Sequence, residues 1–358
     1  MNLAFYAPLK SPNHAVPSGD RAMARALMSA LKSGGHDVTL ASELRIYDPK
    51  GSLQSQVELR DAASNEITRI IALAESEKWQ AWMTYHNYYK APDLIGPAVA
   101  QALNIPYILV EATRAKKRLD GPWADFAKDA EAACDAAAAI MYLTEQDAEA
   151  LYRDAPDGQH LIHLHPFLDR DTLPPASTDT GPMLSVAMMR HGDKLASYQL
   201  IADALGGMPN QDWKLDIAGD GPAADQVKSM MAPFPNQVRF HGALDSESLG
   251  KLYGQASVLF WPGVNEAFGL TYLEAQAAGV PVVAQDRPGV RDVTHGTHPD
   301  PNEGTQPLAN AISSLLGDPE LRQTRANQAR QYVQDNHLRG AATQTLNSAL
   351  AQVTGHQS

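Results

Sequence analysis

Two glutamates eight positions apart, Glu266 and Glu274, offer the clearest chemistry in this chain. Residues 258–286, VLFWPGVNEAFGLTYLEAQAAGVPVVAQD, predict a buried strand, a loop carrying Glu266, a glycine turn at Gly269, a helix carrying Glu274, and a second strand. Open α/β sheets bind ligands at the carboxyl ends of their strands, so Glu266 is expected at the mouth of a site. The helix that begins near Gly269 directs free backbone N–H groups to the same place, which suits a phosphate.

Two cations, Arg190 and Lys194, complement these acids. In the segment SVAMMRHGDK, residues 185–194, Arg190 ends a predicted buried strand and Lys194 opens the next helix, so both side chains can reach an anion bound at the loop. A diphosphate leaving group gains negative charge in the transition state, and fixed positive groups stabilise that charge. The alternative is a surface ion-pair set in which the two cations meet Asp193 and Asp203.

Strand-like runs alternate with helical patterns along the chain, which predicts a doubly wound, parallel α/β architecture. The expected strands are 3–7, 37–41, 80–86, 106–111, 138–143 and 160–167 in the first half, then 184–189, 214–218, 238–241, 258–261 and 281–284. Residues 169–182 are rich in Pro, Ser, Thr, Asp and Gly, which predicts a linker. We therefore expect two domains, residues 1–168 and 183–338.

The pattern E-x7-E followed by EAQAAGVPVVA resembles that of the retaining nucleotide-sugar glycosyltransferases with the GT-B fold, in the family numbered 4, or group 1. The resemblance spans nearly the whole chain and is strongest from residue 184 to residue 293. It implies an α/β fold of two Rossmann-like domains that face a central cleft. It also implies that the last helix, within residues 339–358, joins the first domain.

The resemblance assigns roles to individual residues. Glu266, Arg190 and Lys194 form the catalytic set, in which the two cations hold the diphosphate and Glu266 faces the sugar hydroxyls. Glu274 accepts hydrogen bonds from the ribose hydroxyls. The remaining donor-binding residues bring backbone amides to the diphosphate and sugar: Phe268, Gly269, Leu270, Thr271 and, from the first domain, Gly19. Each glutamate also has a plain interpretation, as a solvated loop or helix charge.

Three residues of the first domain are candidates for the acceptor side: Ser18, His86 and Glu111. Ser18 or Asp20 can cap the first helix, and that structural role is the alternative. His86 lies with several tyrosines at the end of a predicted strand and could bind an acceptor sugar or a polar headgroup; packing is the alternative. Many relatives carry a histidine where this chain has Glu111.

Composition limits the partners. The formal net charge of −12 disfavours a nucleic-acid surface. No apolar run approaches the roughly 18 residues of a membrane span, the start lacks a signal-peptide pattern, and Cys134 is the only cysteine. We therefore expect a cytoplasmic protein. One basic cluster, Arg114, Lys116, Lys117 and Arg118, is either a solvated loop or an acceptor-side patch for phosphate or anionic lipid, which would give a peripheral contact at the inner membrane face.

The strand-and-turn segment 217–224 contains G-x-G-x-x-A, which formally matches a dinucleotide fingerprint. It does not open the first βαβ unit, so we favour a structural turn. The expected function is a retaining sugar transfer from a nucleoside diphosphate sugar, without a metal or cofactor. The alternatives are a sugar-nucleotide epimerase of the same fold and an NAD-dependent oxidoreductase built on this turn. The nucleotide base, the sugar and the acceptor stay open.

Overall fold

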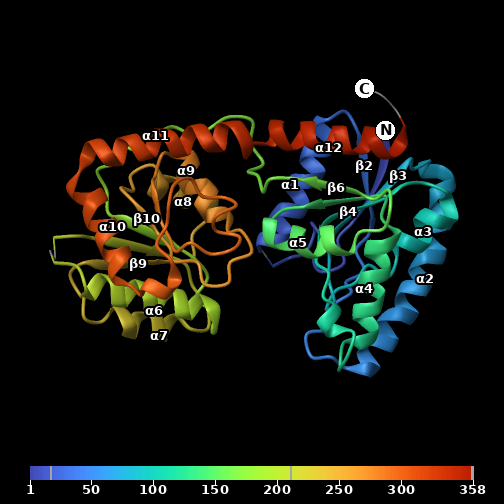
Figure 1. Ribbon diagram of the computed structural model, residues 1–358, viewed down its shortest axis with the longest axis horizontal. Helices are drawn as coiled ribbons and strands as arrows, with labels where there is room; N and C mark the ends of the chain where they lie inside the picture. The colour runs from blue at the N-terminus through green and yellow to red at the C-terminus, as the bar shows by residue number, and fades with distance from the viewer. Residues whose placement is uncertain (17, 210–211, 356–358) are drawn as a thin grey trace. The chain divides into compact units, whose positions relative to one another are not determined.

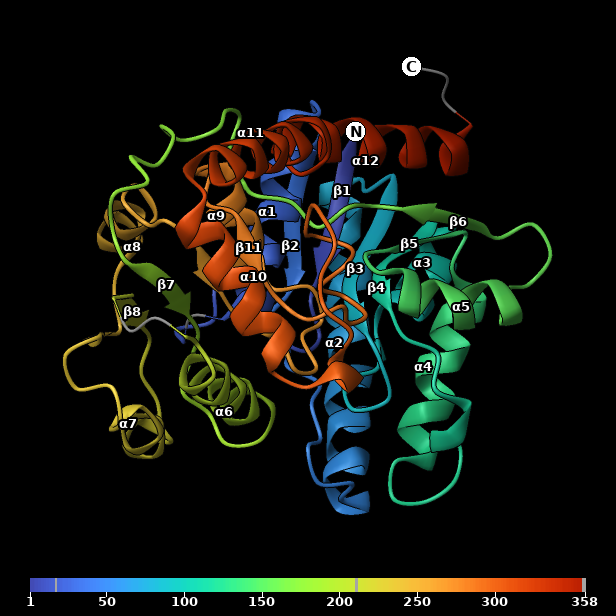
Figure 2. The ribbon, with the colours of Figure 1, turned by 60° about the vertical axis from the view of Figure 1, so that its left-hand side comes forward.

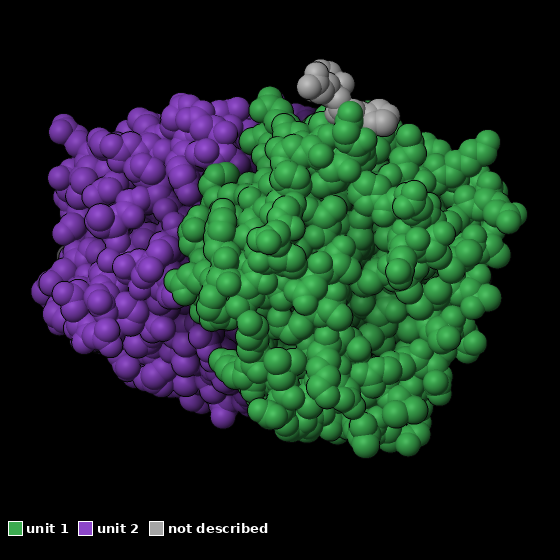
Figure 3. All heavy atoms as spheres, turned by 45° about the vertical axis from the view of Figure 1, so that its right-hand side comes forward, with its two compact units in different colours: residues 1–169, 339–358 green, residues 170–338 purple. Residues whose placement is uncertain are grey.

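The chain folds into two compact units. The structure, a computed structural model, describes residues 1–16, 18–209 and 212–355. Unit 1 comprises Met1–Asp169 together with Arg339–Ser358, and unit 2 comprises Arg170–Leu338. Figure 3 draws unit 1 in green and unit 2 in purple. The division lies close to the start of the segment that the sequence marks as a linker.

Unit 1 is built on a parallel sheet of six strands in the order β2-β1-β3-β4-β5-β6. Its central strands are buried almost throughout, which explains their continuous apolar runs. The strands are β1 (Asn2–Tyr6), β2 (Asp37–Ser42), β3 (Ala81–Asn87), β4 (Tyr107–Ala112), β5 (Ala139–Tyr142) and β6 (His160–His163). The α-helices are α1 (Gly19–Ser33), α2 (Leu53–Glu77), α3 (Gly96–Leu103), α4 (Ala124–Ala136), α5 (Glu145–Asp154) and the last helix, α12 (Arg339–Thr354), with a short 3-10 helix at Lys116–Arg118.

Helix α12 lies beside α1 in unit 1 (Figures 1 and 2). The Thr343 hydroxyl donates to the Ala30 carbonyl over 3.1 Å. The His36 Nε2 atom lies 2.9 Å from the Asn347 Oδ1 atom. Gly34 permits this approach, because a Cβ there would lie 2.4 Å from the Asn347 Oδ1 atom. The end of the chain is thus part of the first unit.

Unit 2 repeats the plan with a parallel sheet of five strands in the order β11-β10-β7-β8-β9. Figure 1 shows α6 and α7 on one face of this sheet and α9 and α11 on the other. The strands are β7 (Met183–Val186), β8 (Leu215–Ala218), β9 (Val238–Gly242), β10 (Leu259–Phe260) and β11 (Val282–Val283). The α-helices are α6 (Asp193–Gly206), α7 (Ala224–Met231), α8 (Ser246–Tyr253), α9 (Leu270–Ala277), α10 (Gln306–Gly317) and α11 (Pro319–Asn336), with a short 3-10 helix at Pro301–Glu303.

The expected linker, residues 169–182, is bound to unit 2 over most of its length. The backbone N–H of Ser177 donates to the Ala278 carbonyl, and that of Gly181 donates to the Gln255 carbonyl, both over 2.7 Å. The Arg322 side chain also forms an ion pair with Asp179 at 2.6 Å. A polar, proline-containing composition therefore marks a boundary here without marking a free tether.

The predicted α/β class is confirmed, since every expected strand range contains a strand of the described chain. Four strands are shorter than expected: β6 ends at His163 and β7 at Val186, before the expected residues 167 and 189. Strands β10 and β11 keep only two ladder residues each, although their flanks are buried. Within the described residues, no helix combines the length and the apolar character needed to cross a membrane.

Candidate functional site

Glu266 and Lys194, which are 72 positions apart, meet in unit 2 as an ion pair. The Trp261 indole Nε1 donates a 2.8 Å hydrogen bond to Glu266 Oε1, and the Lys194 Nζ atom lies 5.4 Å from the Trp261 ring centroid. The Glu266 side chain is 11% exposed and the Lys194 side chain 30%, so the pair is partly shielded from water and open on one side. The structure thus joins one predicted acid to one predicted cation.

Contacts within unit 2 fix the segments that carry this pair. The Ser197 hydroxyl of α6 accepts from the Val264 N–H over 3.0 Å and donates to the Asp193 carbonyl over 3.1 Å. The Tyr272 hydroxyl of α9 donates to the Trp261 carbonyl over 3.1 Å. The start of α6, the end of β10 and the start of α9 are therefore tied to the loop of Glu266.

The amino end of α9 lies beside the Glu266 carboxyl group. Gly269 caps the helix with φ of +65°, a left-handed conformation that favours glycine. A Cβ at this position would lie 2.9 Å from the Tyr272 ring and 3.9 Å from the Glu266 carboxyl carbon. Phe268 is buried, whereas Leu270 and Thr271 are half-buried. The predicted donor-binding turn therefore has the free helix end that a phosphate requires.

Glu274 lies one turn into α9 and is held by Tyr253, a residue that the sequence did not single out. The Tyr253 hydroxyl contacts Glu274 Oε2 at 3.0 Å and Thr271 Oγ1 at 2.8 Å. Burial raises the pKa of Glu274, and the Tyr253 hydrogen bond and the charge of Arg170 oppose that rise. A cavity of about 520 Å³ opens on this carboxylate, lined among others by Arg170, Ser246, Leu249, Tyr253 and Glu274. Glu274 therefore faces a cavity large enough for part of a ligand.

Arg190 is exposed in the loop between β7 and α6, and no carboxylate of the described residues forms an ion pair with it. The loop is braced by the turn at Gly219 and Gly221. The Met189 N–H donates to the Asp220 carbonyl over 2.9 Å, and a Cβ on Gly221 would lie 2.4 Å from the Met189 carbonyl oxygen. These glycines make room for the chain's own backbone, which favours the structural turn over a dinucleotide site.

In unit 1, His86 lies at the carboxyl end of β3. Its ring lies between the carboxylate of Asp20 in α1 and that of Glu111 at the carboxyl end of β4. Its Nδ1 atom is 3.3 Å from Asp20 Oδ1 and 3.9 Å from Glu111 Oε2. Burial alone lowers the pKa of His86, but Glu111 and Asp20 outweigh it and raise this pKa to about 9. Burial raises the pKa of Glu111, and the charge of His86 opposes that rise. The imidazole is therefore held as a cation at neutral pH.

Backbone strain marks the same two residues. His86 has φ of +69° and Glu111 has φ of +57°, which are unusual values for residues with a side chain. Such conformations cost on the order of 1–3 kcal/mol each and concentrate at functional sites. Of the two cap candidates, Ser18 caps α1 and accepts from the Arg21 N–H over 3.3 Å, whereas Asp20 lies in the first turn of the helix. Gly19 begins α1, and Pro17 lies outside the described residues.

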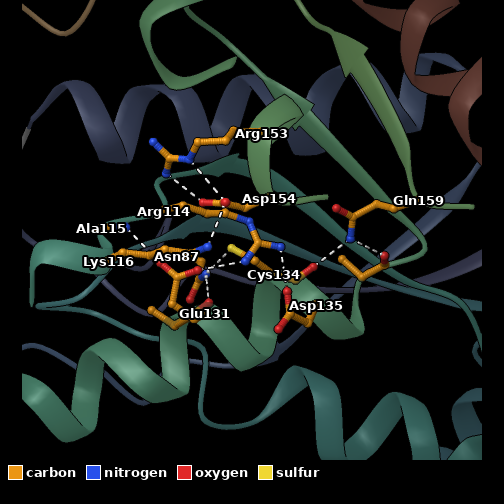
Figure 4. Close-up of polar contacts among 12 residues, drawn as sticks. Asn87, Arg114, Ala115, Lys116, Glu131, Cys134, Asp135, Arg153, Asp154 and Gln159 are labelled. Carbon is orange, nitrogen blue, oxygen red and sulfur yellow. Dashed lines mark hydrogen bonds and ion pairs between the residues drawn. The ribbon is translucent and has the colours of Figure 1, made fainter. Parts of the chain in front are cut away.

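The basic cluster of unit 1 does not form one open patch. Arg114 is 6% exposed, and its guanidinium forms 2.7 Å ion pairs with Glu131 and Asp135 of α4 (Figure 4). Lys116 forms a 2.7 Å ion pair with Asp154. Neither interpretation of the cluster, a solvated loop or an acceptor-side patch, holds for Arg114, because its buried charge is paired inside the protein. Two other members, Lys117 and Arg118, form no such ion pair in the described part of the chain.

The described residues hold no cluster of three or more His, Cys, Asp or Glu side chains that could bind a metal ion. The lone Cys134 is buried, and burial raises the pKa of its thiol to about 12. Among the candidate groups of unit 2, the Lys194 ammonium, the Arg190 guanidinium and the amino end of α9 are positive.

Comparisons with known proteins agree with this architecture. Residues 186–332 match the family model described as "Glycosyl transferases group 1". An alpha-D-kanosaminyltransferase of Streptomyces kanamyceticus is 26% identical over 264 residues, which cover 68% of each chain. Several other relatives are matched over less than half of their own length.

Solved structures resemble the chain over nearly its full length. A sucrose-phosphate synthase of Thermosynechococcus elongatus superposes with a TM-score of 0.74 at 17% identity, covering 99% of this chain and all of the other. The Anabaena protein HepE, solved in complex with UDP, gives a TM-score of 0.73 at 13% identity and covers 98% of this chain. At such identities the likeness establishes the fold, and the family model adds the enzyme class. The chain is a glycosyltransferase with the GT-B fold, and residues 186–332 of unit 2 match the group 1 family.

Proposed function

We propose that this glycosyltransferase moves a sugar from a nucleoside diphosphate sugar to a hydroxyl of an acceptor, with retention of the anomeric configuration and without a metal ion. The observation that carries the proposal is the Lys194–Glu266 ion pair beside the amino end of α9, the helix that also holds Glu274. Cations, a helix end and two acids are the groups that a diphosphate sugar needs. The UDP bound by HepE supports the same donor class.

Charge on the diphosphate is met by three groups in this proposal. Lys194 exchanges its bond to Glu266 for a phosphate oxygen, and the exposed Arg190 reaches the diphosphate from the neighbouring loop. A charged hydrogen bond contributes about 1.5–3 kcal/mol, whereas a helix end contributes about 0.3–2 kcal/mol. The two side chains therefore dominate phosphate affinity and replace the positive charge that a divalent cation supplies in other enzymes.

The two acids divide the remaining contacts. Glu274, facing its cavity, accepts hydrogen bonds from the ribose hydroxyls, because an ionised carboxylate is a pure acceptor. Glu266 binds hydroxyls of the transferred sugar, with Phe268, Gly269, Leu270 and Thr271 supplying backbone contacts. The acceptor attacks on the face from which the diphosphate leaves, and a leaving phosphate oxygen takes the acceptor proton, so no dedicated general base is assigned.

Unit 1 supplies the acceptor side. Glu111 and His86 stand at neighbouring strand ends, the position at which open α/β sheets bind ligands. Their carboxylate and imidazolium offer an acceptor and a donor to a sugar hydroxyl. Gly19 and the cap residue Ser18 lie at the start of α1, next to Asp20 and its contact with His86. The cytoplasmic location expected from the sequence fits a nucleotide-sugar donor and stays a prediction.

The direct test is titration of the purified protein with UDP, GDP, ADP and NADH, followed by thermal unfolding. A bound ligand stabilises the native state by mass action, so the correct nucleotide raises the melting temperature. We expect a shift with one nucleoside diphosphate and none with NADH. Binding of NADH together with indifference to all three diphosphates would refute the proposal.

Product analysis separates transfer from the alternative of epimerisation. A transferase given only its nucleotide sugar releases nucleoside diphosphate slowly, by transfer to water. An epimerase converts the sugar while it stays attached to the nucleotide. Appearance of an isomeric nucleotide sugar, without release of free diphosphate, would favour the epimerase.

A further inference from the structure

Two cations of unit 1, Lys90 and Arg118, share one pair of aromatic rings. The Lys90 Nζ atom lies 5.6 Å from the centroid of the Tyr89 ring and 5.2 Å from that of the Trp123 ring. The Arg118 Cζ atom lies 4.9 Å and 5.9 Å from the same two centroids. Both charges are therefore held in one small region just after β3, although 28 positions separate the residues in the sequence.

The aromatic base under these cations is fixed in place. Tyr89 and Trp123 pack edge to face with centroids 5.7 Å apart. The Trp123 Nε1 donates to the Asp48 carbonyl over 2.9 Å, and the Gln56 side chain donates to the Pro122 carbonyl over 2.9 Å. Cation–π attraction then places both charges without an acid. The arrangement is ordered before any ligand arrives.

No acid of the described residues forms an ion pair with these two charges, in contrast to Arg114 and Lys116, close to Arg118 in the sequence, which each have a carboxylate partner. The Nε atom of Arg118 is buried and has no hydrogen-bond partner there. Both side chains as a whole are half-exposed, so a ligand can reach them. Two like charges near the same rings repel, and an anion bound by both would relieve that repulsion. Two cations without an acidic partner are unusual in a chain whose net charge is −12.

We propose that Lys90 and Arg118 bind a phosphate group carried by the acceptor; this inference rests on the proposed transferase function. A guanidinium fork matches phosphate oxygens in two-point contact, and an ammonium adds a point charge. Tyr88 connects the pair to the hydroxyl-binding cluster: its ring lies 4.9 Å from that of His86 and 5.6 Å from that of Tyr89. In this proposal an acceptor places its hydroxyl at His86 and its phosphate at the cation pair.

Two sources of phosphate fit this chemistry, a soluble sugar phosphate and a phospholipid headgroup. We would measure binding of glucose 6-phosphate against glucose by calorimetry. In parallel we would measure flotation with phosphatidylcholine vesicles that do or do not contain phosphatidic acid. Preference for glucose 6-phosphate assigns the soluble source, and preference for the anionic vesicles assigns the lipid source. No preference for phosphate in either arm overturns the inference.

The variant Lys90→Gln/Arg118→Gln tests the residues. The double substitution should weaken the phosphate-dependent binding by at least about tenfold, since each of the two substitutions removes a charge-assisted contact. The charge-preserving variant Lys90→Arg/Arg118→Lys should bind phosphate more tightly than Lys90→Gln/Arg118→Gln, which separates loss of charge from other effects of substitution. The matched control Lys128→Gln/Lys228→Gln removes two exposed lysines elsewhere and should bind like the parent. Equal phosphate affinity of the parent and Lys90→Gln/Arg118→Gln would refute the assignment.

UDP binding, measured on the same samples, keeps this inference separate from the proposed function. If the parent binds the nucleoside diphosphate and hydrolyses its sugar donor slowly, but shows no phosphate preference, only the acceptor inference fails. If no nucleoside diphosphate binds at all, the proposed function fails and the acceptor inference fails with it. Both results are readable without knowing the natural acceptor.

Discussion

Alanine in place of Gly221 should displace the loop that presents Arg190. Gly221 has φ of +152°, and a Cβ there would lie 2.4 Å from the Met189 carbonyl oxygen, well inside the 3.0 Å that real Cβ contacts respect. The two backbone segments must separate. That separation breaks the bond from the Met189 N–H to the Asp220 carbonyl and the bond from the Ala223 N–H to the Met189 carbonyl, both 2.9 Å long.

The free energy of unfolding should fall by about 3–8 kcal/mol, from three contributions. Overpacking costs about 1–3 kcal/mol. The two backbone hydrogen bonds contribute about 0.5–1.5 kcal/mol each. The left-handed backbone adds about 1–2 kcal/mol for a residue with a side chain. In a unit of this size, the melting temperature should fall by roughly 10 °C.

Thermal unfolding and UDP titration of Gly221→Ala measure the two consequences together. We expect a lower melting temperature and, because Arg190 follows Met189 directly, UDP affinity reduced by about tenfold. Gly340→Ala in α12 is the matched control, since no atom lies within 4 Å of the added methyl group and alanine favours helix. Parent-like melting and parent-like UDP affinity in Gly221→Ala would refute the reasoning.

Three further predictions concern single side chains. Glu266→Gln should lower turnover at least about tenfold while UDP affinity holds or tightens, because Lys194 loses its competing anion; unchanged turnover in a steady-state assay would contradict this. Tyr253→Phe removes a hydrogen bond that lowers the pKa of Glu274, so that pKa rises and UDP binding by calorimetry should weaken more at about pH 6 than at about pH 8; an equal loss at both would count against it. Arg114→Ala should destabilise the protein to urea by about 1–3 kcal/mol, because the mostly buried Glu131 carboxylate loses its charged partner, more than a change at exposed Lys117.

The elements of the fold were predictable because their signals are local. Apolar runs such as those of β1 and β4 match buried parallel strands, and helices α1 and α5 begin at Ser18 and Thr144 caps. The predicted strands at β10 and β11 are longer than the two-residue strands of the structure, because burial continues past the last ladder hydrogen bond. Hydropathy indicates which residues are buried, but only the structure shows which of them form backbone hydrogen bonds with a neighbouring strand.

The candidate site was predictable in part. Glu266, Glu274, Lys194 and Gly269 follow from spacing and from the strand–loop–helix context, and the structure joins Lys194 to Glu266. The sequence did not predict which residues contact these site residues. Tyr253 reaches Glu274 from a separate helix over 21 positions, and nothing in its local pattern distinguishes it from a core tyrosine.

The sequence by itself determined which residues end strands and which glycines form turns. It also determined which acids and cations lie near those strand ends and turns. Only the tertiary structure decided how charges pair. Arg114 and Arg118 are four positions apart, yet one is buried between two acids of α4 and the other lies over Tyr89 and Trp123. The physical reason is that an ion pair depends on distance in space, and residues brought together by parallel strands and crossover helices are far apart in the chain.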